Sequence, residues 1–120
     1  MSPSYRVQHY NGPMPSLFAE LPSSSQEVFE TLCQAPGVRI ERIVSQGQAS
    51  ASGFWYEQPQ AEWVLLVRGR ATLSLLDPEE VVELAAGDYL LLTPRRRHRV
   101  EETSADAIWL AVHLTGQAHQ

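Results

Sequence analysis

Short apolar runs, each of the length of a single strand, follow one another from Val38 to Leu114. Gly, Pro, Asp or Ser stands between one run and the next, which is the spacing of a sandwich or barrel. No helical pattern between the runs could make a parallel crossover, so the fold predicted is an all-β jelly roll and not an α/β sheet. The runs are Val38–Ser45, Gly53–Gln58, Glu62–Arg68, Ala71–Leu76, Val81–Leu84, Asp88–Thr93, Arg97–Thr103 and Ala107–Leu114.

The segment before these runs has helical spacing. Ser24–Glu27 has the sequence of a capping box, apolar residues recur at Val28, Phe29 and Leu32, and Pro36-Gly37 ends the pattern. One short helix is therefore predicted over about residues 24–34. Its apolar side would bury Cys33 as a structural cysteine.

Residues 1–22 contain four of the eight prolines and show little periodicity. They are predicted to form an extended arm over the barrel or across a partner subunit. The rest, residues 23–116, is expected to form one domain, with its barrel over about residues 38–114.

The composition of the chain limits which ligands, reactions and cellular locations are expected for the protein. A net charge of −5 argues against a nucleic-acid binder, because such proteins need a basic face. All nine basic residues are arginine, which excludes a lysine Schiff base. The chain has neither a run long enough to cross a bilayer nor the pattern of a secretory signal, and with a single cysteine the expected location is cytoplasmic.

Two segments carry recognisable spacing. In the first, Glu62 and Gly69 are separated by the six residues WVLLVR; the second starts at Gly87, contains Pro94 and reaches His98. This arrangement resembles the two motifs of the cupin superfamily, from roughly Val38 to Leu114. That resemblance implies a jelly-roll barrel with a metal held by three histidines and a glutamate, and a homodimer.

This chain departs from the cupin pattern in its first motif. The paired histidines of the family fall on Tyr56 and Gln58, while the metal-binding glutamate and histidine match Glu62 and His98. The resemblance then implies a weak site for iron, manganese, nickel or zinc at Gln58, Glu62 and His98.

Strand parity sorts the candidates for the barrel interior, because alternate residues share a face. It places His98 inward with Val100 and Glu102, and Arg42 inward with the apolar residues of its run. The predicted lining is Arg42, Tyr56, Gln58, Glu62 and His98, with His113 left open between a ligand and a structural histidine. A closed network, with Arg42 paired to Glu62 and Tyr56 bonded to His98, is the alternative.

Three functions stay open. A weakly bound divalent metal could orient a small carboxylated or hydroxylated molecule for an oxygenase or isomerase reaction, with Arg42 and Gln58 binding that molecule. His98 and Tyr56 could instead be the base and acid of a sugar-epimerase-like enzyme without metal. The third is a non-catalytic sensor or scaffold.

The cluster Arg95–Arg99 is either an anion-binding rim or a solvated edge balanced by Glu101 and Glu102.

Overall fold

The computed structural model describes residues 12–115, and within them the chain forms eight strands and no helix. No helix in this part of the chain could therefore cross a membrane. The strands are β1 (Val28–Ala35), β2 (Val38–Val44), β3 (Ala61–Arg68), β4 (Arg70–Leu75), β5 (Glu80–Ala85), β6 (Tyr89–Leu92), β7 (His98–Thr103) and β8 (Ile108–Leu114).

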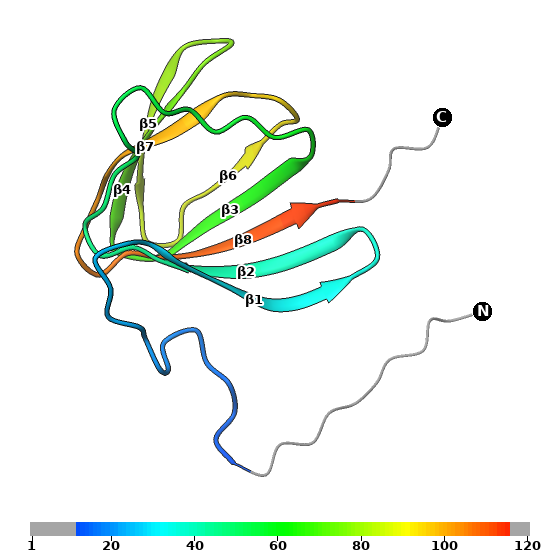
Figure 1. Cartoon of the computed structure of the whole chain (residues 1–120), viewed down its shortest axis with the longest axis vertical. Helices are drawn as coiled ribbons and strands as arrows, with labels where there is room; N and C mark the ends of the chain where they lie inside the picture. The colour runs from blue at the N-terminus through cyan, green and yellow to red at the C-terminus, as the bar shows by residue number, and fades with distance from the viewer. Residues whose placement is uncertain (1–11, 116–120) are drawn as a thin grey trace.

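The strands form two antiparallel sheets that face each other (Figure 1). The larger sheet has the order β1-β2-β8-β3-β6, and the smaller has the order β5-β4-β7. Sequence neighbours are separated within the larger sheet, where β8 lies between β2 and β3. The all-β jelly roll predicted from the sequence is confirmed.

The predicted helix over residues 24–34 is wrong, because β1 occupies most of that segment. Only three apolar positions supported the helix, and short apolar runs do not distinguish helix from strand. The turn at Pro36-Gly37 decides for the strand: Gly37 has φ 83°, as the second central residue of a type II turn requires, and Ala35 pairs with Val38. Cys33 is consequently exposed on an edge strand and not buried.

The predicted strand Gly53–Gln58 is reduced to a single bridge between Tyr56 and His98. Ser50 donates its N–H to the carbonyl of Val100, and Tyr56 donates to that of His98. The chain thus advances from Ser50 to Tyr56 while β7 moves by only two residues, so a regular ladder cannot form. This segment lies along β7 as an extended loop (Figure 1).

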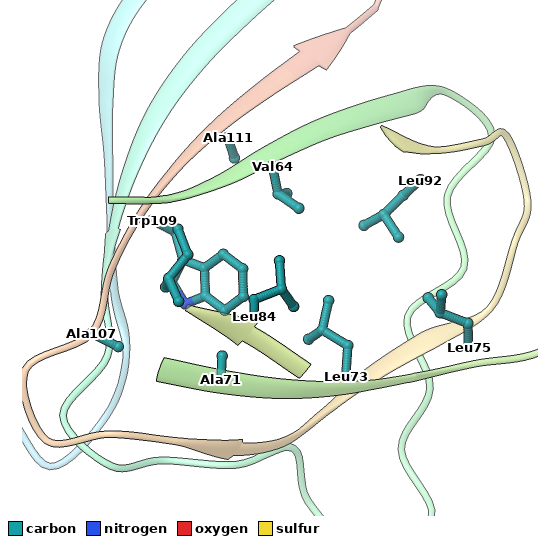
Figure 2. Close-up of a cluster of buried hydrophobic side chains, with 10 residues drawn as sticks. Val64, Ala71, Leu73, Leu75, Leu84, Leu92, Ala107, Trp109 and Ala111 are labelled. Carbon is teal, nitrogen blue, oxygen red and sulfur yellow. The ribbon is translucent and has the colours of Figure 1, made fainter. Parts of the chain in front are cut away.

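Apolar side chains from both sheets fill one end of the interior. Figure 2 shows Val64, Trp109 and Ala111 from the larger sheet facing Ala71, Leu73 and Leu84 from the smaller sheet. Leu66 and Leu75 are fully buried in the core. Because this end is closed by packing, the polar residues that also face inward lie toward the other end.

The side chain of Arg42 is buried outside the barrel, beneath residues 12–27, which form no helix or strand. It donates to the carbonyls of Leu17 at 3.0 Å and Ala19 at 2.8 Å, and it pairs with Glu30 on β1. The prediction that Arg42 points into the barrel is therefore wrong, as is its proposed pairing with Glu62. Alternate residues of β2 take the other face, so Arg39, Glu41 and Ile43 line the interior.

Candidate functional site

A cavity of about 260 Å³ lies between the two sheets. Its apolar side chains are Phe29, Ile43, Val64, Leu73, Leu92, Val100 and Trp109. Its polar side chains are Glu27, Arg39, Glu41, Tyr56, Gln58, Glu62, His98 and His113. A concave site in which polar side chains converge beside an apolar surface is typical of small-molecule binding, although this lining is more polar than usual.

Strand register brings three of the polar side chains into one row. Arg39 on β2 is opposite His113 on β8, and His113 is opposite Glu62 on β3. Directly opposite residues of antiparallel strands point to the same face. The row therefore presents a guanidinium, an imidazole and a carboxyl group side by side on the inner surface of the larger sheet.

Glu41 connects two members of this row. One of its oxygens accepts a hydrogen bond from Arg39 Nη1 at 2.6 Å, and the other accepts one from His113 Nε2 at 2.8 Å. Both partners are buried or partly buried, so the bonds are shielded from water. Glu41 thereby neutralises Arg39 and fixes the orientation of the His113 ring.

Glu62 is buried, and its ion-pair contact is longer than those of Glu41. Its Oε2 lies 4.0 Å from His113 Nε2. Burial raises the pKa of Glu62 above its ordinary value; His113 opposes this shift, while the charge of Glu41 adds to it. Glu62 can therefore hold a proton at a higher pH than an exposed carboxyl group.

The opposite wall carries His98 and Tyr56. Their rings stack with centroids 5.2 Å apart, and the two backbones exchange N–H···O bonds of 2.7 and 3.0 Å. Burial lowers the pKa of His98, which favours the neutral ring, and burial raises the pKa of Tyr56, which keeps the phenol protonated. His98 Nδ1 lies 3.4 Å from the carbonyl oxygen of Arg96, so with Nδ1 donating there, Nε2 is left with its lone pair.

Four of the five predicted site residues line this cavity: Tyr56, Gln58, Glu62 and His98. Arg42 does not, and the ligand-binding role given to it loses its geometric basis. Parity held for His98 and Val100 on β7, but a register shift between Thr72 and Leu73 on the neighbouring strand turns Thr103 inward in place of Glu102.

Sequence reasoning missed Arg39 and Glu41 and left His113 unassigned. On β2 the more apolar set was assumed to face the core, which fails when both faces are covered. The pairing of β2 with β8 aligns Arg39 with His113 and would have identified both residues. Finding it requires the order of the strands in the sheet, which the sequence pattern does not give.

The arginine cluster after β6 forms ion pairs at the surface. Arg96 pairs with Glu80 and Arg97 with Asp77, each at 3.0 Å. Arg99 pairs with Glu101, also at 3.0 Å. These contacts favour the solvated edge over an anion-binding rim.

The donor set fits a standard cupin metal centre poorly. Within residues 12–115, no three His, Cys, Asp or Glu side chains are grouped as metal ligands. His113 Nε2 is engaged by Glu41, and Tyr56 and Gln58 stand where the resemblance would place histidines. Glu62, His98 and Gln58 do line the same cavity, which offers one carboxylate, one imidazole and one amide.

Comparisons with known proteins agree with this architecture. Residues 42–113 match the family model described as "Cupin domain". A protein from Ralstonia eutropha JMP134, named as a candidate mannose-6-phosphate isomerase, is 39% identical with a TM-score of 0.80, and the match covers 88% of this chain and 100% of that one. No curated protein matches the chain.

More distant structures share the fold alone. A cupin superfamily protein from Desulfitobacterium hafniense DCB-2 is 17% identical with a TM-score of 0.71, covering 88% of this chain and 92% of that one. Bacillus subtilis oxalate decarboxylase is 16% identical with a TM-score of 0.60, covering 71% of this chain and 23% of that one. The family match over residues 42–113, with the 39% identical relative, establishes that this chain belongs to the cupin family.

Proposed function

We propose that this cupin binds a small hydroxylated carbonyl compound in its cavity and catalyses an isomerase-type proton transfer on it. The observation that carries the proposal is the pair of facing polar walls. His98 and Tyr56 come from one side, and Glu62 with the Glu41–His113 pair comes from the other. Acid and base groups on both sides of one small cavity are what such a reaction needs.

Each residue has a chemical task in this proposal. Nε2 of His98 takes the proton from the carbon next to the carbonyl group, and the electrons of the broken C–H bond form a carbon–carbon double bond. Glu62 gives its proton to the carbonyl oxygen, while the Tyr56 phenol donates a hydrogen bond to that oxygen. The adjacent hydroxyl then returns a proton to Glu62 as His98 protonates the former carbonyl carbon, so the protons balance.

The pKa directions support this assignment. A base must be unprotonated and an acid protonated near the working pH. Burial lowers the pKa of His98 and raises the pKa of Glu62, so the two pKa values lie closer together than in exposed side chains. The relative from Ralstonia eutropha, named as a candidate isomerase, also favours this reaction type.

A weakly bound divalent cation is a second candidate, favoured by the presence of Gln58, Glu62 and His98 on the wall of one cavity. The related fold of Bacillus subtilis oxalate decarboxylase contains Mn(II) centres. Two strong donors and an amide would give low affinity, so any such cation would be removed by a chelator. No step of the proposed reaction depends on it.

Deuterium exchange tests the proposal. A panel of neutral aldoses and ketoses, mannose included, is incubated with the protein in D₂O and a chelator, and label entering the carbon next to the carbonyl group is followed by NMR. Exchange should fall by about 10²–10⁴ in His98→Gln, as expected for loss of a general base. Tyr56→Phe should also be slow, whereas Tyr89→Phe, at an exposed tyrosine outside the cavity, should match the unmodified protein.

Two results would redirect the assignment. Exchange that needs added Mn²⁺ and stops with chelator would favour the cation-dependent candidate. Absence of exchange with every compound, together with measurable binding, would leave a non-catalytic metabolite-binding cupin.

A further inference from the structure

We infer that the cavity selects neutral hydroxylated molecules of hexose size and rejects their phosphorylated and carboxylated derivatives. This inference names the substrate class of the proposed function and rests on it. It differs from what the sequence suggested, because the cation expected to clamp a carboxylate, Arg42, lies outside the cavity beneath residues 12–27.

The first support is the charge of the lining. Glu27, Glu41 and Glu62 contribute three carboxyl groups, whereas Arg39 is the permanent cation among the lining residues. With Glu62 protonated, as the proposed reaction requires, the carboxylates of Glu27 and Glu41 still outnumber the Arg39 guanidinium. An anion entering this space meets repulsion that partial burial strengthens, since charges interact more strongly away from water.

The second support is that the nearest cations already have anionic partners. Arg39 bonds to Glu41 at 2.6 Å. Arg96, two residues before His98 on the chain, pairs with Glu80 at 3.0 Å. A carboxylate or phosphate would have to displace these partners, and each displaced glutamate would then stand beside the ligand.

The third support is the match between the cavity and hydroxyl groups. Carboxylate oxygens, the Gln58 amide and the Tyr56 phenol all bond well to neutral hydroxyls. The cavity volume of about 260 Å³ lies just below the roughly 300–1,000 Å³ of most small-molecule sites, so it favours a ligand as small as a hexose over a larger one. Apolar residues such as Trp109 and Leu73 supply a surface for the C–H faces of such a ring.

A matched series of ligands tests the inference. Calorimetric titration of the whole chain with mannose, mannose 6-phosphate and mannuronate compares one ring with and without an added negative charge. Mannose should bind at least about tenfold more tightly than either anion. Equal or tighter binding of mannose 6-phosphate would overturn the inference and leave the proposed function standing. Failure of all three to bind would overturn the inference, and the proposed function would fall with it if the panel of aldoses and ketoses also showed no exchange.

A charge substitution provides an independent arm. Glu41→Gln removes one carboxylate and releases Arg39, so the preference for mannose over mannuronate should fall by about tenfold or reverse. Glu79→Gln, at an exposed turn away from the cavity, changes net charge equally and should leave the preference unchanged. Glu27→Gln, at a partly exposed lining position, should shift the preference in the same direction as Glu41→Gln. Unchanged selectivity in both cavity variants would contradict the charge argument.

Discussion

Glu62 shows how neighbouring side chains set the chemistry of a single residue. It is buried on β3, and its Oε2 lies 4.0 Å from His113 Nε2, the same nitrogen that bonds to Glu41. Loss of water outweighs the attraction of His113, so the pKa of Glu62 is raised. The folded state therefore binds the Glu62 proton more strongly than the unfolded chain does.

This sign gives a prediction for Glu62→Gln. The stability that a raised pKa confers is fully present below the ordinary pKa of 4.5 and is lost as pH rises through the folded value. The neutral variant avoids this loss, so it should be the more stable protein near pH 7, by about 1.4 kcal/mol for each unit of pKa shift. Urea unfolding of both proteins from about pH 4 to about pH 8 measures the difference.

The difference between the two proteins should vanish at the acid end of that range. A variant that is less stable near neutral pH would mean that attraction to His113 outweighs burial, contrary to the account of Glu62.

At the scale of elements, Arg42 joins the segment of residues 12–27 to the larger sheet. Its guanidinium bonds to the carbonyls of Leu17 and Ala19 and to Glu30. Arg42→Met should lower the free energy of unfolding by about 2 kcal/mol, discounted because Glu30 is partly exposed. It should also speed proteolysis within residues 12–27, while binding in the cavity is retained.

The matched control is Arg97→Met, which breaks an exposed pair with Asp77 and should cost at most about 0.5 kcal/mol. If Arg42→Met abolished ligand binding but left the rate of proteolysis unchanged, Arg42 would belong to the site after all.

Gly69 is a second element-scale determinant, at the turn between β3 and β4. Its φ is 91°, and a Cβ there would lie 2.9 Å from Ala107 Cα. Gly69→Ala should therefore cost about 1–3 kcal/mol or more in stability. Thermal melting beside Gly12→Ala, where a Cβ would meet nothing within 4 Å, checks this. Equal melting temperatures in the two variants would show that the turn can relax.

For the whole molecule, alternation and turn residues were sufficient to predict the jelly roll and most strands. They were insufficient where tertiary contacts decide whether a segment is a helix or a strand, or which face of a strand points inward. The Val28–Ala35 segment became a strand because β2 pairs with it, and Arg42 lies outside the barrel because Leu17, Ala19 and Glu30 supply its hydrogen-bond partners there.

The sequence predicted the part of the site that belongs to the two cupin-like motifs. Tyr56, Gln58, Glu62 and His98 do line one cavity. Arg39, Glu41 and His113 depend on the order of β2, β8 and β3, which pattern alone does not give. The chemical roles of Tyr56, Gln58, Glu62 and His98 stay predictions, as does the homodimer.

The polar end of the barrel is proposed to be an open ligand site, in which burial keeps the His98 ring neutral. NMR titration of ¹⁵N-labelled histidines, assigned with His98→Gln, measures this directly, with and without mannose. His98 should titrate below its ordinary pKa of 6.5, and mannose should shift the signals of its ring. A His98 that titrates at 6.5 or above, with signals that no neutral hexose moves, would contradict this proposal.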